Sequence, residues 1–233
     1  YDYVSFAKAL DSKNGVLGIS IVRLGVDNIL NTTQMIDSEG NIDYDKITKF
    51  STSDYAGIVS YGFHPGGNQK LSLGVNAKVV YRNIGKFANG FGFGFDLGAM
   101  YNTDSGYKFG AMLRDATTTV NFWSINQKEL SAVVNGEEFN PAPKDKMEIT
   151  MPKLNMGISK NFELNRDLEF LPEAGVNVDF AKTAALISTD FASITPYLGA
   201  ELSFQKMIFV RAGVNKFQNV TDIEDLKRKV TFQ

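Results

Sequence analysis

The stretch from Gly90 to Tyr101 constrains the fold most, because large apolar residues alternate along it with small or polar ones without a break. One set is Phe91, Phe93, Phe95, Leu97, Ala99 and Tyr101, and the other is Gly90, Gly92, Gly94, Asp96, Gly98 and Met100. Successive side chains of a β-strand point to opposite faces of a sheet, whereas an α-helix would spread these phenylalanines around its circumference. The stretch therefore predicts an amphipathic β-strand.

The same alternation recurs along the chain and predicts ten strands. Their approximate ranges are 1–10, 16–29, 55–63, 71–82, 90–101, 107–114, 147–160, 170–179, 196–204 and 208–214. Pro152 interrupts the alternation in the seventh range and predicts a bulge there. Several ranges reach the ~9–11 residues that a strand needs to cross a bilayer, which is longer than the ~5–6 usual in soluble sheets.

Short and long connections alternate between these strands. The short ones are Asp11–Gly15, His64–Lys70, Asn102–Gly106, Asn161–Glu169 and Gln205–Met207. The long ones are Leu30–Asp54, Ala116–Lys146, Ala181–Ser193 and Lys216–Arg228, with Gly85–Asn89 as a short exception. Turns on one side and loops on the other are typical of outer-membrane barrels. We therefore expect one all-β domain over residues 1–233, a transmembrane antiparallel up-and-down β-barrel. A soluble β protein with an apolar core is the alternative.

The charged residues of the alternating strands indicate which face would point inward. In the seven ranges with the clearest alternation, which leaves out 1–10, 16–29 and 147–160, every charged residue named falls on the glycine-rich, polar face: Lys78, Arg82, Asp96, Lys108, Arg114, Glu173, Asp179, Glu201 and Arg211. A Lys or Arg facing lipid at mid-depth costs about 2–4 kcal/mol, so we expect the charges to line the lumen and the apolar faces to meet lipid. They could line a pore or pair with one another as a plug, and we favour the plug.

Composition excludes several classes of site. The chain has no Cys and one His, so thiolate sites and histidine-rich zinc sites are excluded. A net charge of −2 provides no basic field for nucleic acid. The alternating glycines of Gly90–Gly94 lie inside a strand with no helix after them, so they do not predict a phosphate loop. We predict no catalytic residues and no cofactor.

For two further features we prefer the interpretation without a binding role, and for a third the alternatives stay open. His64 lies in a Pro-Gly-Gly turn and is expected to be solvated. Four acidic residues in the first long loop could bind calcium, but their spacing does not match an EF-hand, and a solvated loop is the better prediction. They are Asp37, Glu39, Asp43 and Asp45. Phe122 and Trp123 fall in the predicted loop Ala116–Lys146, where aromatic residues could bind a protein partner, lie at the membrane interface or fold into the lumen.

Segments spread over most of the chain resemble one family of outer-membrane proteins. They are NIDYDKITKFSTSDYAGIVSYG (41–62), GVNAKVVYRNIGKFANGFGFGFDLGAMY (74–101), FGAMLRDATTTVNFWSIN (109–126) and FASITPYLGAELSFQKMIFVRAGVNKFQ (191–218). They are similar to the PorV/PorQ family of the type IX secretion system of Gram-negative bacteria. That family is related to FadL, a fourteen-stranded fatty-acid transporter with an N-terminal hatch. With ten strands here, the resemblance implies that the hatch, a first strand and C-terminal strands lie outside this chain.

The resemblance also implies a function. PorV-like proteins bind the C-terminal signal domains of secreted cargo, and PorQ-like relatives join the attachment complex, so the expected partners are cargo, translocon or attachment-complex proteins and outer-membrane lipid. The role would be non-enzymatic and would use extracellular loops, with addition of a strand to a sheet edge as one mode of binding. A FadL-like transporter of hydrophobic small molecules is the alternative, although the predicted inward face is mainly polar. A soluble β-rich enzyme is a third hypothesis, without a catalytic constellation to favour it.

Overall fold

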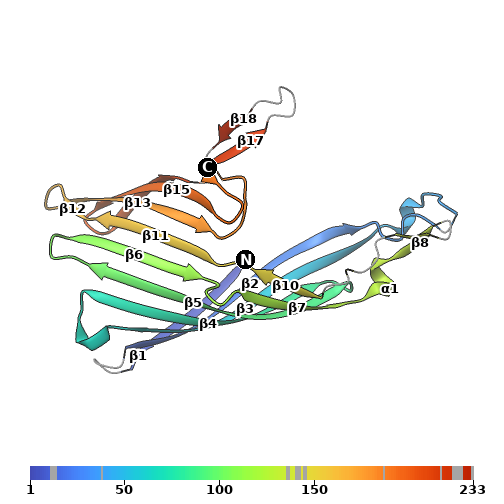
Figure 1. Cartoon of the computed structure of the whole chain (residues 1–233), viewed down its shortest axis with the longest axis horizontal. Coiled ribbons are helices and arrows are strands. Elements are labelled where there is room, and N and C mark those ends of the chain that lie inside the picture. The colour runs from blue at the N-terminus through green and yellow to red at the C-terminus, as the bar shows by residue number, and fades with distance from the viewer. Residues whose placement is uncertain are drawn as a thin grey trace.

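The computed structural model of the chain is built on one large antiparallel sheet (Figure 1). The structure describes residues 1–10, 15–37, 39–134, 137–139, 143, 146–185, 187–215, 217–221 and 228–231. Within these residues, no helix has the length and apolar character that crossing a membrane would require. The prediction of an all-β antiparallel fold is confirmed.

The large sheet has fourteen strands. They are β1 (Asp2–Ala9), β2 (Val16–Asn31), β3 (Thr48–Phe63), β4 (Leu71–Ile84), β5 (Ala88–Asn102), β6 (Tyr107–Arg114), β7 (Thr119–Ile125), β10 (Met147–Thr150), β11 (Lys153–Lys160), β12 (Phe162–Glu163), β13 (Leu168–Asp179), β14 (Ile187–Ser188), β15 (Ser193–Phe204) and β16 (Ile208–Val214). Two small sheets pair β8 (Ala132–Val134) with β9 (Glu137–Phe139) and β17 (Gln218–Thr221) with β18 (Arg228–Thr231). The helical turns are η1 (Tyr44–Lys46), η2 (Pro65–Gly67) and α1 (Gln127–Leu130).

Ten passages of the chain across the sheet correspond to the ten predicted strands. The count of strands is higher because two passages are interrupted and because β12 and β14 are two-residue strands. One passage comprises β6 and β7, which pair with the two halves of β5 and are separated by residues 115–118. The next comprises β10 and β11, which are separated by Met151 and Pro152. Where a bulge is predicted at Pro152, the structure has a break between two strands.

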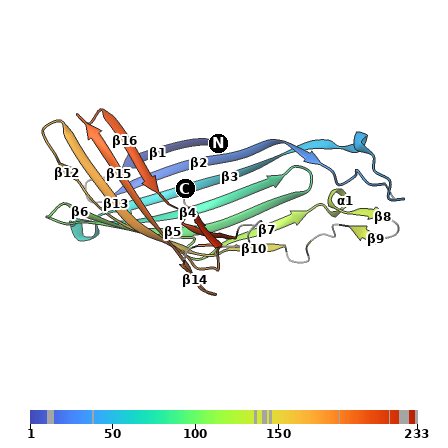
Figure 2. The same ribbon diagram turned by 90° about the horizontal axis from the view of Figure 1, so that it is seen from above.

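The passages pair in the order in which they follow one another, and the sheet is curved, with β13, β15 and β16 at an angle to β2–β5 (Figure 2). Along its length β1 and β16 form the two edges, and no pairing joins them within the described residues. The sheet is therefore open in this structure.

Short turns and long connections lie at opposite ends of the passages, which we call the turn end and the loop end (Figure 1). The exception is the short turn Gly85–Phe87 between β4 and β5, which lies at the loop end. The predicted loop Leu30–Asp54 is too long, since β2 continues to Asn31 and β3 begins at Thr48. Most of the difference lies in β3, because residues 48–54 are mainly polar and contain one large apolar side chain, Phe50, so they show little alternation. Within β2, a bulge lies between Val26 and Ile29, where Asn28 has a positive φ of 61°. Of the other predicted connections, residues 11–14, 135–136, 140–142, 144–145, 186, 216 and 222–227 lie outside the described residues.

The strand register assigns each side chain to a face, because directly paired residues of antiparallel strands share one. Following the pairs from β4 to β16 puts all nine predicted charges on the face of Gly90, Gly92 and Gly94, which we call the polar face. The phenylalanines of β5 lie on the opposite, apolar face. The two-faced character of the strands is confirmed.

Burial is inverted relative to that of a soluble protein. The only buried hydrophobic residues in the described part of the chain are Phe87 and Ala185. Phe91, Phe93 and Phe95 of the apolar face are 42–51% exposed, whereas Asp96, which follows Phe95 in sequence, is 5% exposed. The apolar face is thus not covered by any described part of the chain.

Candidate functional site

The best-packed part of the polar face lies where β7 pairs alongside the glycine-containing part of β5. Trp123 pairs with Gly90, Asn121 pairs with Gly92, and Thr119 lies next to Gly94. The side chains of these three β7 residues lie over the glycines. A Cβ atom on Gly92 would collide with the Asn121 amide, and one on Gly94 with the Thr119 hydroxyl. The alternating glycines therefore make room for a layer of polar side chains from the neighbouring strand.

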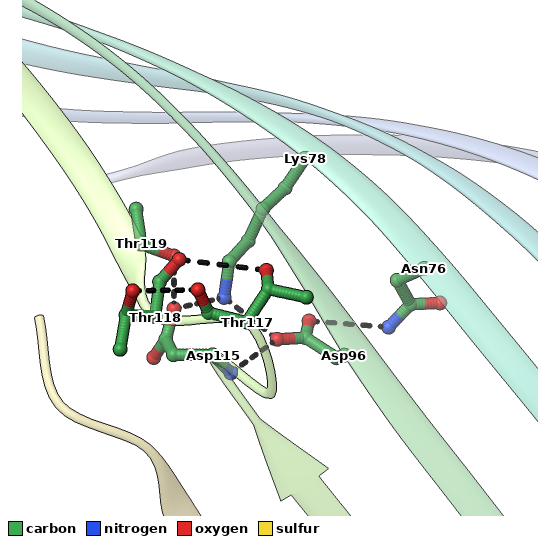
Figure 3. Close-up of polar contacts among 7 residues, drawn as sticks. All are labelled: Asn76, Lys78, Asp96, Asp115, Thr117, Thr118 and Thr119. Carbon is green, nitrogen blue, oxygen red and sulfur yellow. Dashed lines mark hydrogen bonds and ion pairs between the residues drawn. The ribbon is translucent and has the colours of Figure 1, made fainter.

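Lys78 of β4 is the centre of a buried charged cluster in this layer (Figure 3). Its Nζ lies 2.7 Å from Asp96 Oδ1 and 2.5 Å from Asp115 Oδ1. Asp96 also accepts hydrogen bonds from the Asp115 backbone N–H (2.9 Å) and the Asn76 amide (3.4 Å). The side chains of the three charged residues are only 7–12% exposed. Two carboxylates share one ammonium group, so the cluster has a net charge of −1.

The cluster holds residues 115–118, where the chain leaves the sheet between β6 and β7. Asp115 and Thr118 have positive φ angles of 52° and 58°, a conformation that costs energy for residues other than glycine. Asp115 accepts a hydrogen bond from the Thr119 hydroxyl, and the Ala116 N–H donates to the Phe95 carbonyl at 2.8 Å. The buried carboxylate and its partners therefore maintain a backbone conformation that the sequence alone disfavours.

A second group lies beside the first, toward the loop end. The Arg82 guanidinium is 3.3 Å from Asp54 and 3.4 Å from Glu148. The same Glu148 accepts a hydrogen bond from Trp123 Nε1 at 2.9 Å, and the guanidinium lies 5.1 Å from the centroid of the indole. Side chains from four strands are joined in this group, which bridges β3 to β10.

The prediction that Phe122 and Trp123 lie in a loop is wrong, because Thr119–Ile125 forms strand β7. Phe122 pairs with Phe91 on the apolar face and is 51% exposed, whereas Trp123 lies on the polar face. The alternation of Thr119, Asn121 and Trp123 with Val120 and Phe122 was the signal for this strand. The position of Trp123 on the polar face corresponds to the third of the alternatives considered for it, an orientation toward the predicted lumen. A role in partner binding stays a prediction for both residues.

Most of the remaining predicted charges also have partners on the polar face. Glu201 pairs with Arg211, Asp179 with Lys153 at 2.9 Å, and Glu173 accepts a hydrogen bond from the Tyr197 hydroxyl at 3.1 Å. Within the described residues, Lys108 and Arg114 form no ion pair. On this face the pairing favours mutually paired charges over a row of free charges.

Toward the turn end the polar face is hollow instead of filled. A Cβ atom on Gly74 or Gly98 would meet only a backbone oxygen of a neighbouring strand within 4 Å. A Cβ atom on Gly110 would meet no atom within that distance. A hollow of about 550 Å³ lies over these glycines, with Met100 and Met112 in its lining. Lys108, Glu173 and Tyr197 line it as well.

The loop and turn residues singled out in the sequence have local partners. Asp37 accepts hydrogen bonds from the backbone and side-chain N–H groups of Asn41, which hold the pKa of its carboxyl below the usual range. Asp43 caps η1 and pairs with Lys46 at 3.5 Å. His64 Nδ1 lies 3.0 Å from the Leu71 carbonyl oxygen. No group of three or more His, Cys, Asp or Glu residues in the described ranges is arranged to hold a metal ion.

Comparisons with protein-family models and with curated proteins find no match to this chain.

Proposed function

We propose that this chain forms most of a transmembrane β-barrel in the outer membrane of a Gram-negative bacterium. The supporting observation is the inverted burial, with phenylalanines exposed on one face and ion pairs buried on the other. In water, an uncovered apolar face spanning so many strands would promote aggregation. In a bilayer, the same face contributes favourable free energy by contacting lipid.

The aromatic residues of the apolar face support the same proposal. A row near the loop end comprises the mutually paired Tyr55, Tyr81, Phe91 and Phe122, and Tyr101 and Phe109 pair near the turn end. Phe91 and Tyr101 are ten residues apart on β5. At ~3.3 Å per residue and a strand tilt of ~40°, the two rows would be about 25 Å apart along the membrane normal, which is the height of the apolar band in outer-membrane barrels.

The function proposed for this barrel is non-enzymatic binding of protein partners at the loop end, as in the PorV/PorQ family that the sequence resembles. The partners would be secreted cargo signal domains, or proteins of the type IX translocon or attachment complex. Charged side chains of the polar face at the loop end are already paired with one another. The side chains available for binding a partner at this end are therefore those of the connections. The barrel would act as a rigid support for them.

Extraction and gel migration test the membrane assignment. The natural protein should stay in the membrane fraction in plain buffer and at high salt and require detergent for extraction. An unheated sample should migrate differently from a boiled one on a denaturing gel. Release into plain buffer would refute the barrel.

Replacing residues 127–145 with a short Gly-Ser linker tests the partner role. The linker leaves β7 and β10 intact, so heat-modifiable migration should be retained while co-purification of translocon proteins or cargo in mild detergent is lost. Replacing residues 64–70 at the turn end is the matched control. Retained co-purification in the first variant would exclude this connection from partner binding.

The hollow over Gly74, Gly98 and Gly110 favours one alternative, a FadL-like transporter of hydrophobic small molecules. Its methionines offer apolar surface, although Lys108 and Glu173 make it less apolar than a lipid pocket usually is. Native mass spectrometry of the detergent-extracted protein tests this alternative. A bound lipid lost in a Gly98→Leu/Gly110→Leu variant would support transport, and an unoccupied wild-type protein would count against it.

A further inference from the structure

The connection between β2 and β3, of which the structure describes residues 32–37 and 39–47, combines a hydrogen-bonded backbone with uncovered apolar side chains. Tyr44 is 71% exposed, Ile42 is 56% exposed and Ile36 is 41% exposed. These residues lie far from the apolar face discussed above. Arg23 of β2 pairs with Tyr55, which belongs to the aromatic row near the loop end. From Arg23, β2 continues for about 26 Å to Asn31, where the connection begins. Lipid covering the apolar band would not reach them.

Hydrogen bonds within the loop and at its base hold its backbone. An isolated bridge joins Ile36 to Ile42, and the Asp43 N–H donates to the Met35 carbonyl at 2.7 Å. At its base, the 5% exposed Asn31 accepts hydrogen bonds from the Thr33 backbone and hydroxyl and donates to Thr48 at 3.1 Å. A preorganised loop loses little conformational entropy on binding, which favours affinity.

The charges around these apolar residues are nearly all negative. Residues 32–47 contain four carboxylates and one lysine. Asp37 and Asp43 are engaged in holding the loop. The side chains of Glu39 and Asp45 form no hydrogen bond or ion pair with described residues, so they can contribute their charge to a binding partner.

We propose that residues 32–47 form a docking surface for a protein segment that carries apolar side chains flanked by Lys or Arg. Tyr44 and Ile42 are the apolar anchors, and Glu39 and Asp45 provide electrostatic complementarity and steering. An anionic lipid headgroup does not fit, because the carboxylates would repel it. This inference rests on the proposed partner-binding role and identifies the chemistry of one partner site.

The test uses the detergent-extracted protein as bait for a phage-displayed library of random twelve-residue peptides. Selected peptides should be enriched in Lys or Arg next to aromatic or aliphatic residues. Synthetic copies should bind about ten-fold or more weakly to Tyr44→Ser. Glu39→Gln/Asp45→Asn leaves the capping carboxylates in place, and it should weaken binding and reduce its dependence on salt.

Leu164→Ser is the matched control, because Leu164 is 56% exposed, as Ile42 is, but lies at the turn end. It should not change peptide binding. Selection of acidic peptides, equal binding by Tyr44→Ser, or a loss in Leu164→Ser equal to that in Tyr44→Ser would overturn the proposal. If the protein also leaves the membrane in plain buffer, the barrel proposal fails with it; if heat-modifiable migration persists, only the docking surface fails.

Discussion

The polar face has two regions with the same sequence pattern and opposite packing. In the covered region, Gly90, Gly92 and Gly94 lie beneath side chains of β7. In the open region, Gly74, Gly98 and Gly110 lie beneath a hollow. A glycine in a strand can therefore make room for a neighbour's side chain or simply leave space, and only the neighbouring strand determines which.

Lys78→Met should have the largest effect on this difference. It leaves the buried Asp96 and Asp115 carboxylates without their cation and should lower the free energy of unfolding by about 3–5 kcal/mol, as measured by urea unfolding in lipid vesicles. Lys108→Met, in the open region, should change it by less than about 0.5 kcal/mol. Adding Asp96→Asn and Asp115→Asn to Lys78→Met should restore much of the loss. Equal effects of the two lysine variants would contradict the contrast between the regions.

Gly92→Ala and Gly110→Ala should change stability in opposite directions. The methyl group at position 92 would meet the Asn121 side chain and the Val120 carbonyl oxygen, and overpacking of this kind costs about 1–3 kcal/mol. At position 110 it would enter open space, and reduced entropy of the unfolded chain should make the change neutral or stabilising by up to about 1 kcal/mol. The same unfolding assay applies. A stabilising effect of Gly92→Ala would contradict tight packing here, because it would mean that the side chains of β7 shift without cost to make room for the methyl group.

Trp123→Phe should have a smaller effect. It keeps an aromatic ring over Gly90 but removes the hydrogen bond to Glu148, which should cost about 0.5–1.5 kcal/mol in the same unfolding assay. Glu148→Gln keeps an acceptor for the indole and is the conservative comparison. If Trp123→Phe is neutral while Gly92→Ala is costly, packing and not the polar contact holds the covered region together.

Cysteine labelling distinguishes the regions with little change in stability. The chain has no Cys, so a single introduced thiol can be followed without interference. Asn121 is 4% exposed, so Asn121→Cys should react with a water-soluble maleimide at least about ten-fold more slowly than Met112→Cys in the hollow. Rates are compared in the folded protein, with urea-unfolded samples as the reference. Similar folded-state rates would mean that both regions are equally open to water.

The sequence was sufficient to predict what depends on periodicity. Alternation predicts the ten passages and the common face of Lys78, Asp96, Glu173 and Arg211, because successive side chains of a strand always point to opposite faces of the sheet. The excursion at residues 115–118 does not follow from the sequence pattern. It breaks the alternation ahead of β7, so the sequence predicts a loop there, because a backbone excursion stabilised by tertiary ion pairs leaves no periodic signal.

The Lys78 cluster has a further consequence for how the strands find their alignment. A slip of one residue would exchange the two faces and is opposed by every phenylalanine of β5. A slip of two residues would preserve the faces, because the repeated Gly-Phe pairs look the same two residues along. The hydrophobic pattern cannot distinguish these alignments, but the contacts among Lys78, Asp96 and Asp115 can, since they depend on specific positions in three passages. The buried charges thus select one alignment from a degenerate set.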